Sequence, residues 1–229
     1  MPNRPMMNDI KLLRLGAMLQ IIAIVLLGPL FVKIIAAISP QPPWAGMETY
    51  IAHYSLLQSI PYWGGFILII GNILFVVSSG RLSNIKETAL YPLALITVTI
   101  YSSLVALNYT LQVAYIPAAV QSSSLGIELF SMDNPNSIAW SIEMYAYAIL
   151  GIAMWLVSPS FRGNRVKDLI RYLLVFDAII SISGAFFAIV FIGGMLDEGS
   201  LVGYYFWNLL ILVIAFLILY EYRSEKNTY

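Results

Sequence analysis

Residues 89–158 read ALYPLALITVTIYSSLVALNYTLQVAYIPAAVQSSSLGIELFSMDNPNSIAWSIEMYAYAILGIAMWLVS, and this stretch decides the fold. It consists of two long apolar segments joined by a loop without Lys or Arg. Polar groups recur at helical spacing in the first segment, at Thr97, Tyr101, Asn108, Gln112 and Tyr115. The same spacing relates a second set, Asn136, Trp140, Glu143, Tyr147 and Gly151. Because a carboxylate or an amide is costly against lipid, we expect the two stripes to meet inside a helical bundle.

The composition of the whole chain indicates a membrane protein. Its 229 residues are 60% hydrophobic and 10% charged, whereas a soluble domain carries about 25% charged residues. We therefore expect one transmembrane domain over residues 1–229. Twelve basic and twelve acidic residues balance, which argues against a nucleic-acid partner. With no cysteine and one histidine, His53, the sequence predicts no disulfide, no metal site and no cofactor.

Apolar runs predict an all-α bundle of six transmembrane helices. We expect these spans at about 15–38, 59–79, 89–116, 138–157, 170–196 and 201–220. Proline removes a backbone hydrogen bond and clashes with the preceding turn, so Gly28-Pro29 should kink the first span and Pro117 should end the third. Residues 47–54 have the pattern of a short amphipathic helix at the membrane surface.

Basic residues alternate between the connections of the predicted spans. They occupy the N-terminus, the connections 80–87 and 159–171, and the C-terminus, while the other three connections contain none. The positive-inside rule then places both termini in the cytoplasm. We expect a multi-pass integral membrane protein with the lipid bilayer as its first partner, in the plasma membrane of a prokaryote.

Counting depth along the helices brings polar groups to one level in the outer half of the bundle. The predicted ligand site consists of Lys33, Asn108, Gln112, Tyr115, Glu143, Tyr147 and Asn208. Within it, Glu143 should face the interior and accept hydrogen bonds from Gln112 or Tyr115. Lys33 should supply the counter-charge. In the alternative reading Lys33 extends to the headgroups and Glu143 faces water. Asn108 and Gln112 would then only hold helices together.

Two further polar residues, Asn72 and Asp177, are expected to be buried deeper in the bundle. An ionised Asp177 would cost about 2.5–3.5 kcal/mol there, so we expect a neutral or well hydrogen-bonded group. Small residues such as Gly184 and Ala188 allow close helix contact. Such residues favour close packing between helices of this chain. On a lateral face of the bundle they would favour contact with another chain in a homo- or hetero-oligomer.

No motif identifies a reaction, and no catalytic residue is predicted. Three functions stay open. The leading one is binding, and transport, of a small or amphiphilic ligand through a polar pocket in the outer half. The second is a partner subunit without a ligand. The third is an intramembrane enzyme with Glu143 or Asp177 as acid or base on a lipid-like substrate. An internal cavity would favour transport. Two titratable groups in one pocket would favour an enzyme. A filled core would favour a partner subunit.

Overall fold

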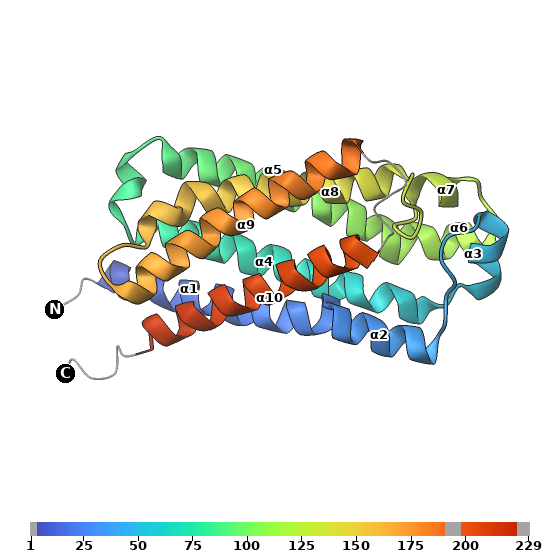
Figure 1. Cartoon of the computed structure of the whole chain (residues 1–229), viewed down its shortest axis with the longest axis horizontal. Coiled ribbons are helices and arrows are strands. Elements are labelled where there is room, and N and C mark those ends of the chain that lie inside the picture. The colour runs from blue at the N-terminus through green and yellow to red at the C-terminus, as the bar shows by residue number, and fades with distance from the viewer. Residues whose placement is uncertain (1–3, 191–197, 224–229) are drawn as a thin grey trace.

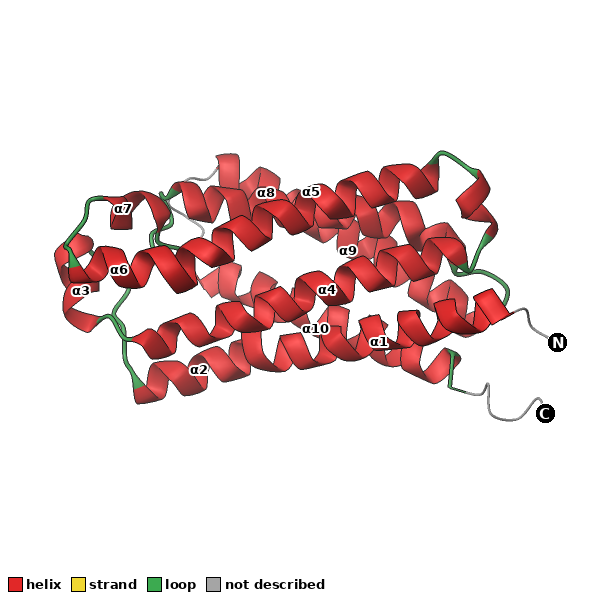
Figure 2. Cartoon of the chain, turned by 180° about the vertical axis from the view of Figure 1, so that it is seen from behind, coloured by secondary structure: helices red, strands yellow, loops and turns green. Residues whose placement is uncertain are grey.

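The computed structural model describes residues 4–190 and 198–223, and within these ranges the chain forms helices and loops without strands (Figure 2). Six helices in this part are long and apolar enough to cross a membrane. They are Met7–Ile38, Leu56–Arg81, Leu90–Gln121, Ile138–Ser160, Arg165–Phe187 and Gly203–Glu221. The arrangement is compatible with an integral membrane protein, and the side on which each terminus lies stays a prediction.

The helices follow the apolar runs closely. In chain order the α-helices are α1 Arg4–Leu27, α2 Pro29–Ile38, α3 Met47–His53, α4 Ile60–Arg81, α5 Leu90–Thr110, α6 Ile116–Gln121, α7 Gly126–Phe130, α8 Ile138–Val157, α9 Arg165–Val190 and α10 Glu198–Glu221. Short 3-10 turns cover Leu56–Ser59, Asn84–Glu87 and Ser158–Ser160. The expected fifth span ran to residue 196, and its last part lies outside the described residues.

The helices form an elongated bundle with both chain ends at one end (Figure 1). Helix α1 packs along α4, α5 along α8, and α8 along α9, while α10 contacts both α1 and α9. Apolar side chains from these helices fill the centre, including Leu13, Phe75, Val105, Leu150, Ile170 and Ile214. At the end opposite the termini, α3, α6, α7 and their loops form what we call the cap (Figure 1). The cap has an apolar cluster of its own around Tyr50, Ile116 and Ile127.

The expected kink at Gly28-Pro29 is confirmed, because α1 ends at Leu27 and α2 begins at Pro29. A side chain at Gly28 would overlap the carbonyl oxygen of Ile24. Glycine is therefore the residue that lets the chain turn so closely on itself before the proline.

The prediction that Pro117 ends the third span is wrong. The helical path continues through a π-helical segment, Leu111–Tyr115, into α6, which runs to Gln121. In this segment the N–H of Ile116 bonds to the carbonyl of Leu111, five residues back. A π turn is wider than an α turn, and such a local change lets a helix accommodate a proline. The widened turn also rotates the residues beyond it relative to those before it.

Charges differ between the two ends of the bundle. At the end that carries the termini, Arg81 Nε lies 3.1 Å from Asp9 Oδ1 and Lys167 Nζ lies 3.8 Å from Glu221 Oε1. At the cap, residues 39–55 and 122–137 contain Glu48, Glu128 and Asp133 and no Lys or Arg. The cap therefore has an acidic surface, which raises the local concentration of cations.

Candidate functional site

Glu143 on α8 faces the bundle interior, as predicted, and the residue is 7% exposed. Its Oε1 accepts a hydrogen bond from the Tyr109 hydroxyl at 2.6 Å, and its Oε2 accepts one from Asn108 Nδ2 at 2.9 Å. The prediction that Gln112 or Tyr115 donates a hydrogen bond to Glu143 is wrong, because Asn108 and Tyr109 are the donors. Asn108 Nδ2 also lies 3.1 Å from the Ala139 carbonyl, so this amide joins α5 to α8 at two points.

A second hydroxyl extends this contact along α8. The hydroxyl oxygens of Tyr109 and Tyr147 are 3.1 Å apart. The Tyr109 ring lies against Gly65 of α4, where any added Cβ would overlap it. Glycine at this position therefore allows α4 to approach Tyr109 and fix its ring beside Glu143. Tyr147 in turn packs edge-on against Trp207 of α10, with ring centroids 4.9 Å apart.

A thread of amides continues from these tyrosines towards α1. Tyr101 packs edge-on against Tyr147, with ring centroids 5.6 Å apart. Asn72 Nδ2 donates to the Tyr101 hydroxyl at 3.2 Å, and Gln20 Nε2 donates to Asn72 Oδ1 at 2.7 Å. Asn72 is 1% exposed, so its predicted burial is confirmed. Its two hydrogen bonds connect α1, α4 and α5. We call the set Gln20, Asn72, Tyr101, Tyr147, Tyr109, Glu143 and Asn108 the polar thread.

Gln112 fastens the cap to the bundle. Its Nε2 donates to the Phe130 carbonyl at 2.7 Å, and its Oε1 accepts from the Met132 N–H at 3.1 Å. Both ends of the amide are therefore used on the backbone of the cap. The side chain lies in the π-helical segment, one turn beyond Asn108, so the polar thread and the cap meet here.

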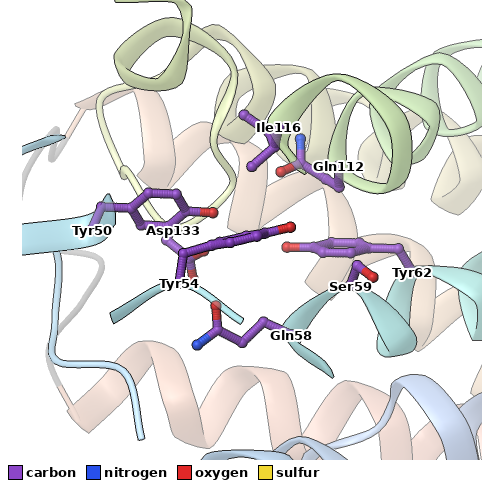
Figure 3. Close-up of a pocket in the computed structure, with 8 residues that line it drawn as sticks. All are labelled: Tyr50, Tyr54, Gln58, Ser59, Tyr62, Gln112, Ile116 and Asp133. Carbon is purple, nitrogen blue, oxygen red and sulfur yellow. The ribbon is translucent and has the colours of Figure 1, made fainter. Parts of the chain in front are cut away.

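A small pocket opens between the cap and the bundle, and we call it the tyrosine pocket. It is lined by Tyr50, Tyr54, Gln58, Ser59, Tyr62, Gln112, Ile116 and Asp133 (Figure 3). The Tyr54 and Tyr62 hydroxyls point towards each other across it (Figure 3). The Tyr54 hydroxyl is buried and has no hydrogen-bond partner among the described residues. About 10 Å³ is open to the centre of a water-sized molecule, which suits one water or the charged nitrogen of a small ammonium ion.

Asp133 provides the negative charge of this pocket. Burial of its carboxyl group raises the pKa of Asp133 to about 6, against a smaller opposite effect of the hydrogen bond from Tyr50. The residue as a whole is exposed, so the desolvated part is the carboxyl end that lines the pocket. Burial, followed by the nearby Asp133 charge, also raises the pKa values of Tyr50 and Tyr54. Both phenols therefore stay neutral hydrogen-bonding groups.

The tyrosine pocket is connected to Glu143 through two tyrosine side chains, Tyr62 and Tyr109. The ring of Tyr62, which lines the pocket, packs against the ring of Tyr109 at 5.4 Å between centroids. Tyr109 holds Glu143 from the other side through its hydroxyl. One aromatic layer therefore separates the pocket from the buried carboxyl group.

Three residues of the predicted site lie elsewhere. Lys33 is exposed on α2, with its Nζ 5.2 Å from the centre of the Tyr205 ring, and the described residues do not pair it with Glu143. Tyr115 packs edge-on against Phe130 in the cap. Asn208 on α10 is buried, and its Nδ2 donates to the Tyr204 carbonyl at 2.8 Å.

Asp177 is buried on α9 with 0% exposure, as expected, and neither carboxyl oxygen has a hydrogen-bond partner among the described residues. Of the two expected states, a neutral group or a well hydrogen-bonded one, these contacts favour the neutral group. The helix packs closely on α8 here: a Cβ at Gly151 would lie 2.9 Å from that of Ser181. Neither Asp177 nor Glu143 lines the tyrosine pocket.

The sequence reasoning missed Tyr109, Gln20, Tyr54 and Asp133. Tyr109 stands one position after Asn108, outside the stripe of regular spacing. Gln20 had a recognisable signal, because it is an isolated amide in an apolar helix and such a group seeks a partner helix. Tyr54 and Asp133 lie in connections, where no periodicity indicates a common site.

No family model, curated protein or solved structure matches this chain. Function is therefore inferred from the chemistry of the two polar clusters. One cluster is the polar thread, which includes the buried carboxyl group of Glu143, and the other is the tyrosine pocket, lined by oxygen atoms at the acidic end.

Proposed function

We propose that this protein binds a small ammonium-type cation in the tyrosine pocket, as the entry site of a membrane carrier. The observation that carries the proposal is the set of oxygen atoms around a small open space, including the buried Tyr54 hydroxyl, which has no hydrogen-bond partner among the described residues. A buried polar atom without a partner is costly, and a ligand that donates hydrogen bonds would satisfy it.

The chemistry of the lining favours a cation over an anion. Phenolic, amide and carboxylate oxygens accept hydrogen bonds from an ammonium group. Aromatic ring faces attract cations as well. The lining contains one carboxyl group, Asp133, and neither Lys nor Arg. The acidic surface of the cap supplies the same preference over a longer range.

The route inward supports carriage as well as binding. Tyr62 belongs both to the pocket lining and to the aromatic layer above Glu143. A cation leaving the pocket towards the bundle would meet the carboxyl group of Glu143 next.

Isothermal titration of the full chain in lipid nanodiscs tests binding directly. Methylammonium chloride should give saturable heat, and tetramethylammonium chloride, whose cation is larger and has no N–H donor, should give none. Tyr54→Phe removes one acceptor and keeps the ring, and a hydrogen bond contributes about 1 kcal/mol, so we expect binding to weaken roughly five-fold. Tyr145→Phe, at an exposed position on α8, is the matched control.

Potassium chloride provides the second comparison, since an alkali cation would use the same oxygen atoms. Tight potassium binding without methylammonium binding would reassign the pocket to a metal cation. Absence of saturable heat with either salt would refute the proposal.

A partner subunit without a ligand is the second candidate, and one observation favours it. Both oxygens of Glu143 are already paired, so the bundle is filled at the level where a carrier needs space. This candidate predicts that neither methylammonium nor Tyr54→Phe changes any property of the isolated chain.

A further inference from the structure

Glu143 is a buried carboxyl group that lacks a cation. Its two hydrogen-bond donors, Tyr109 and Asn108, are neutral. The ion pairs within the described residues are Arg81–Asp9, Lys167–Glu221 and Arg171–Asp168, and none involves Glu143. A carboxylate taken from water without a counter-charge is strongly disfavoured, and proteins commonly resolve this by protonation.

Within the described residues, the titratable groups near Glu143 are all phenols. They are Tyr147 from α8 itself, Tyr101 and Tyr109 from α5, Tyr62 from α4 and Tyr204 from α10. No Lys, Arg or second carboxyl group is among them. The charge of this site is therefore set by the proton on Glu143 alone.

The hydroxyl pair beside Glu143 accommodates either protonation state. With Glu143 ionised, the Tyr147 hydroxyl donates to Tyr109, and the Tyr109 hydroxyl donates to Glu143. With Glu143 protonated, its O–H donates to Tyr109, which donates to Tyr147. Both arrangements use the same distances of 2.6 and 3.1 Å, because a hydroxyl group both donates and accepts. A proton is gained or lost without moving a heavy atom.

We infer that Glu143 is a proton-exchange site, protonated at rest, with Tyr109 and Tyr147 as its hydrogen-bond relay. On exchange the carboxyl O–H bond breaks and its proton passes to the Tyr109 oxygen, while the Tyr109 hydroxyl proton passes to the Tyr147 oxygen. The Tyr147 hydroxyl proton passes in turn to a water molecule that enters with the cation, which leaves the carboxylate and two neutral phenols. Resting on the proposed function, this site is linked to the tyrosine pocket: a cation moving inward past Tyr62 stabilises the carboxylate and releases one proton. Entry of one positive charge and loss of another keep the interior neutral.

Infrared difference spectroscopy of the full chain in nanodiscs tests the inference. At neutral pH the wild-type chain should show the C=O stretching band of a protonated carboxyl group. Glu143→Gln should remove the component of this band that Glu143 contributes, while Asp177→Asn, the control at the other buried carboxyl group, should leave that component in place. Tyr109→Phe should shift its frequency, because the carboxyl group loses a hydrogen bond. A neutral-pH spectrum unaffected by Glu143→Gln would overturn the proton site.

The same spectra separate the proton site from the pocket. Adding methylammonium chloride at constant pH should weaken the Glu143 band, and Asp133→Asn should remove this response while leaving the band itself. A band that persists without a methylammonium response would retain the proton site and overturn its link to the pocket. If Glu143→Gln does not fold, Tyr109→Phe decides, because it keeps the carboxyl group: an unshifted band would then refute the assignment.

Discussion

Tyr109→Phe is the substitution that bears most directly on the polar thread. It removes one hydroxyl group and keeps the ring that packs against Gly65, Tyr62 and Phe66. Two hydrogen bonds are lost, at 2.6 Å to Glu143 and at 3.1 Å to Tyr147. Interhelical hydrogen bonds in membranes average about 0.6 kcal/mol, whereas a buried group left unsatisfied costs about 1–3 kcal/mol. We expect the free energy of unfolding to fall by about 1–3 kcal/mol.

Reversible unfolding of the full chain in mixed micelles, with increasing denaturing detergent, measures this difference. Tyr115→Phe is the matched control, because its hydroxyl lies on the same helical path and makes no hydrogen bond to the described residues. It should change the unfolding free energy by less than about 0.5 kcal/mol, the usual range away from such bonds. Equal stability of the two variants would show that the Tyr109 hydroxyl does not hold Glu143.

Three further predictions concern the surroundings of the thread. Gly65→Ala should lower stability by about 1–3 kcal/mol in the same unfolding assay, because its methyl group would displace the Tyr109 ring; Gly184→Ala, with open space around it, should be tolerated. Gln112→Leu should release the cap and speed its proteolysis, since both amide bonds to the cap backbone are lost; unchanged cleavage would argue against that role. Methylammonium binding should weaken as the pH falls through about 6, where Asp133 becomes protonated, and titrations from pH 5 to 8 would show a flat profile if Asp133 were not involved. Because this pKa lies above the ordinary 3.8, the empty protein should also lose stability as the pH rises between these values.

The helices could be predicted because their signal is local. Apolar runs of sufficient length show where helices form, and the polar residues spaced along α8 show that Glu143 faces inward. The break before Pro29 followed from the chemistry of proline and glycine. Each of these inferences needs one segment of sequence and a known period.

The partners of Glu143 could not be predicted, because depth was counted from the wrong end of the third helix. The sequence places that end at Pro117, whereas the helix continues through the π turn to Gln121. Asn108 and Tyr109 therefore reach the level of Glu143, where Gln112 was expected. The tyrosine pocket could not be predicted either, because Tyr54 and Asp133 come from separate loops that only the folded cap brings together.

Protection of a single cysteine tests cation binding in the tyrosine pocket most directly. The chain contains no cysteine, so Ser59→Cys places one thiol in the pocket lining and Ser122→Cys places one at an exposed position of the cap. Methylammonium chloride should slow maleimide labelling at residue 59 and leave residue 122 unchanged, and Asp133→Asn should abolish the protection. Equal labelling rates at residue 59 with and without methylammonium would contradict the account.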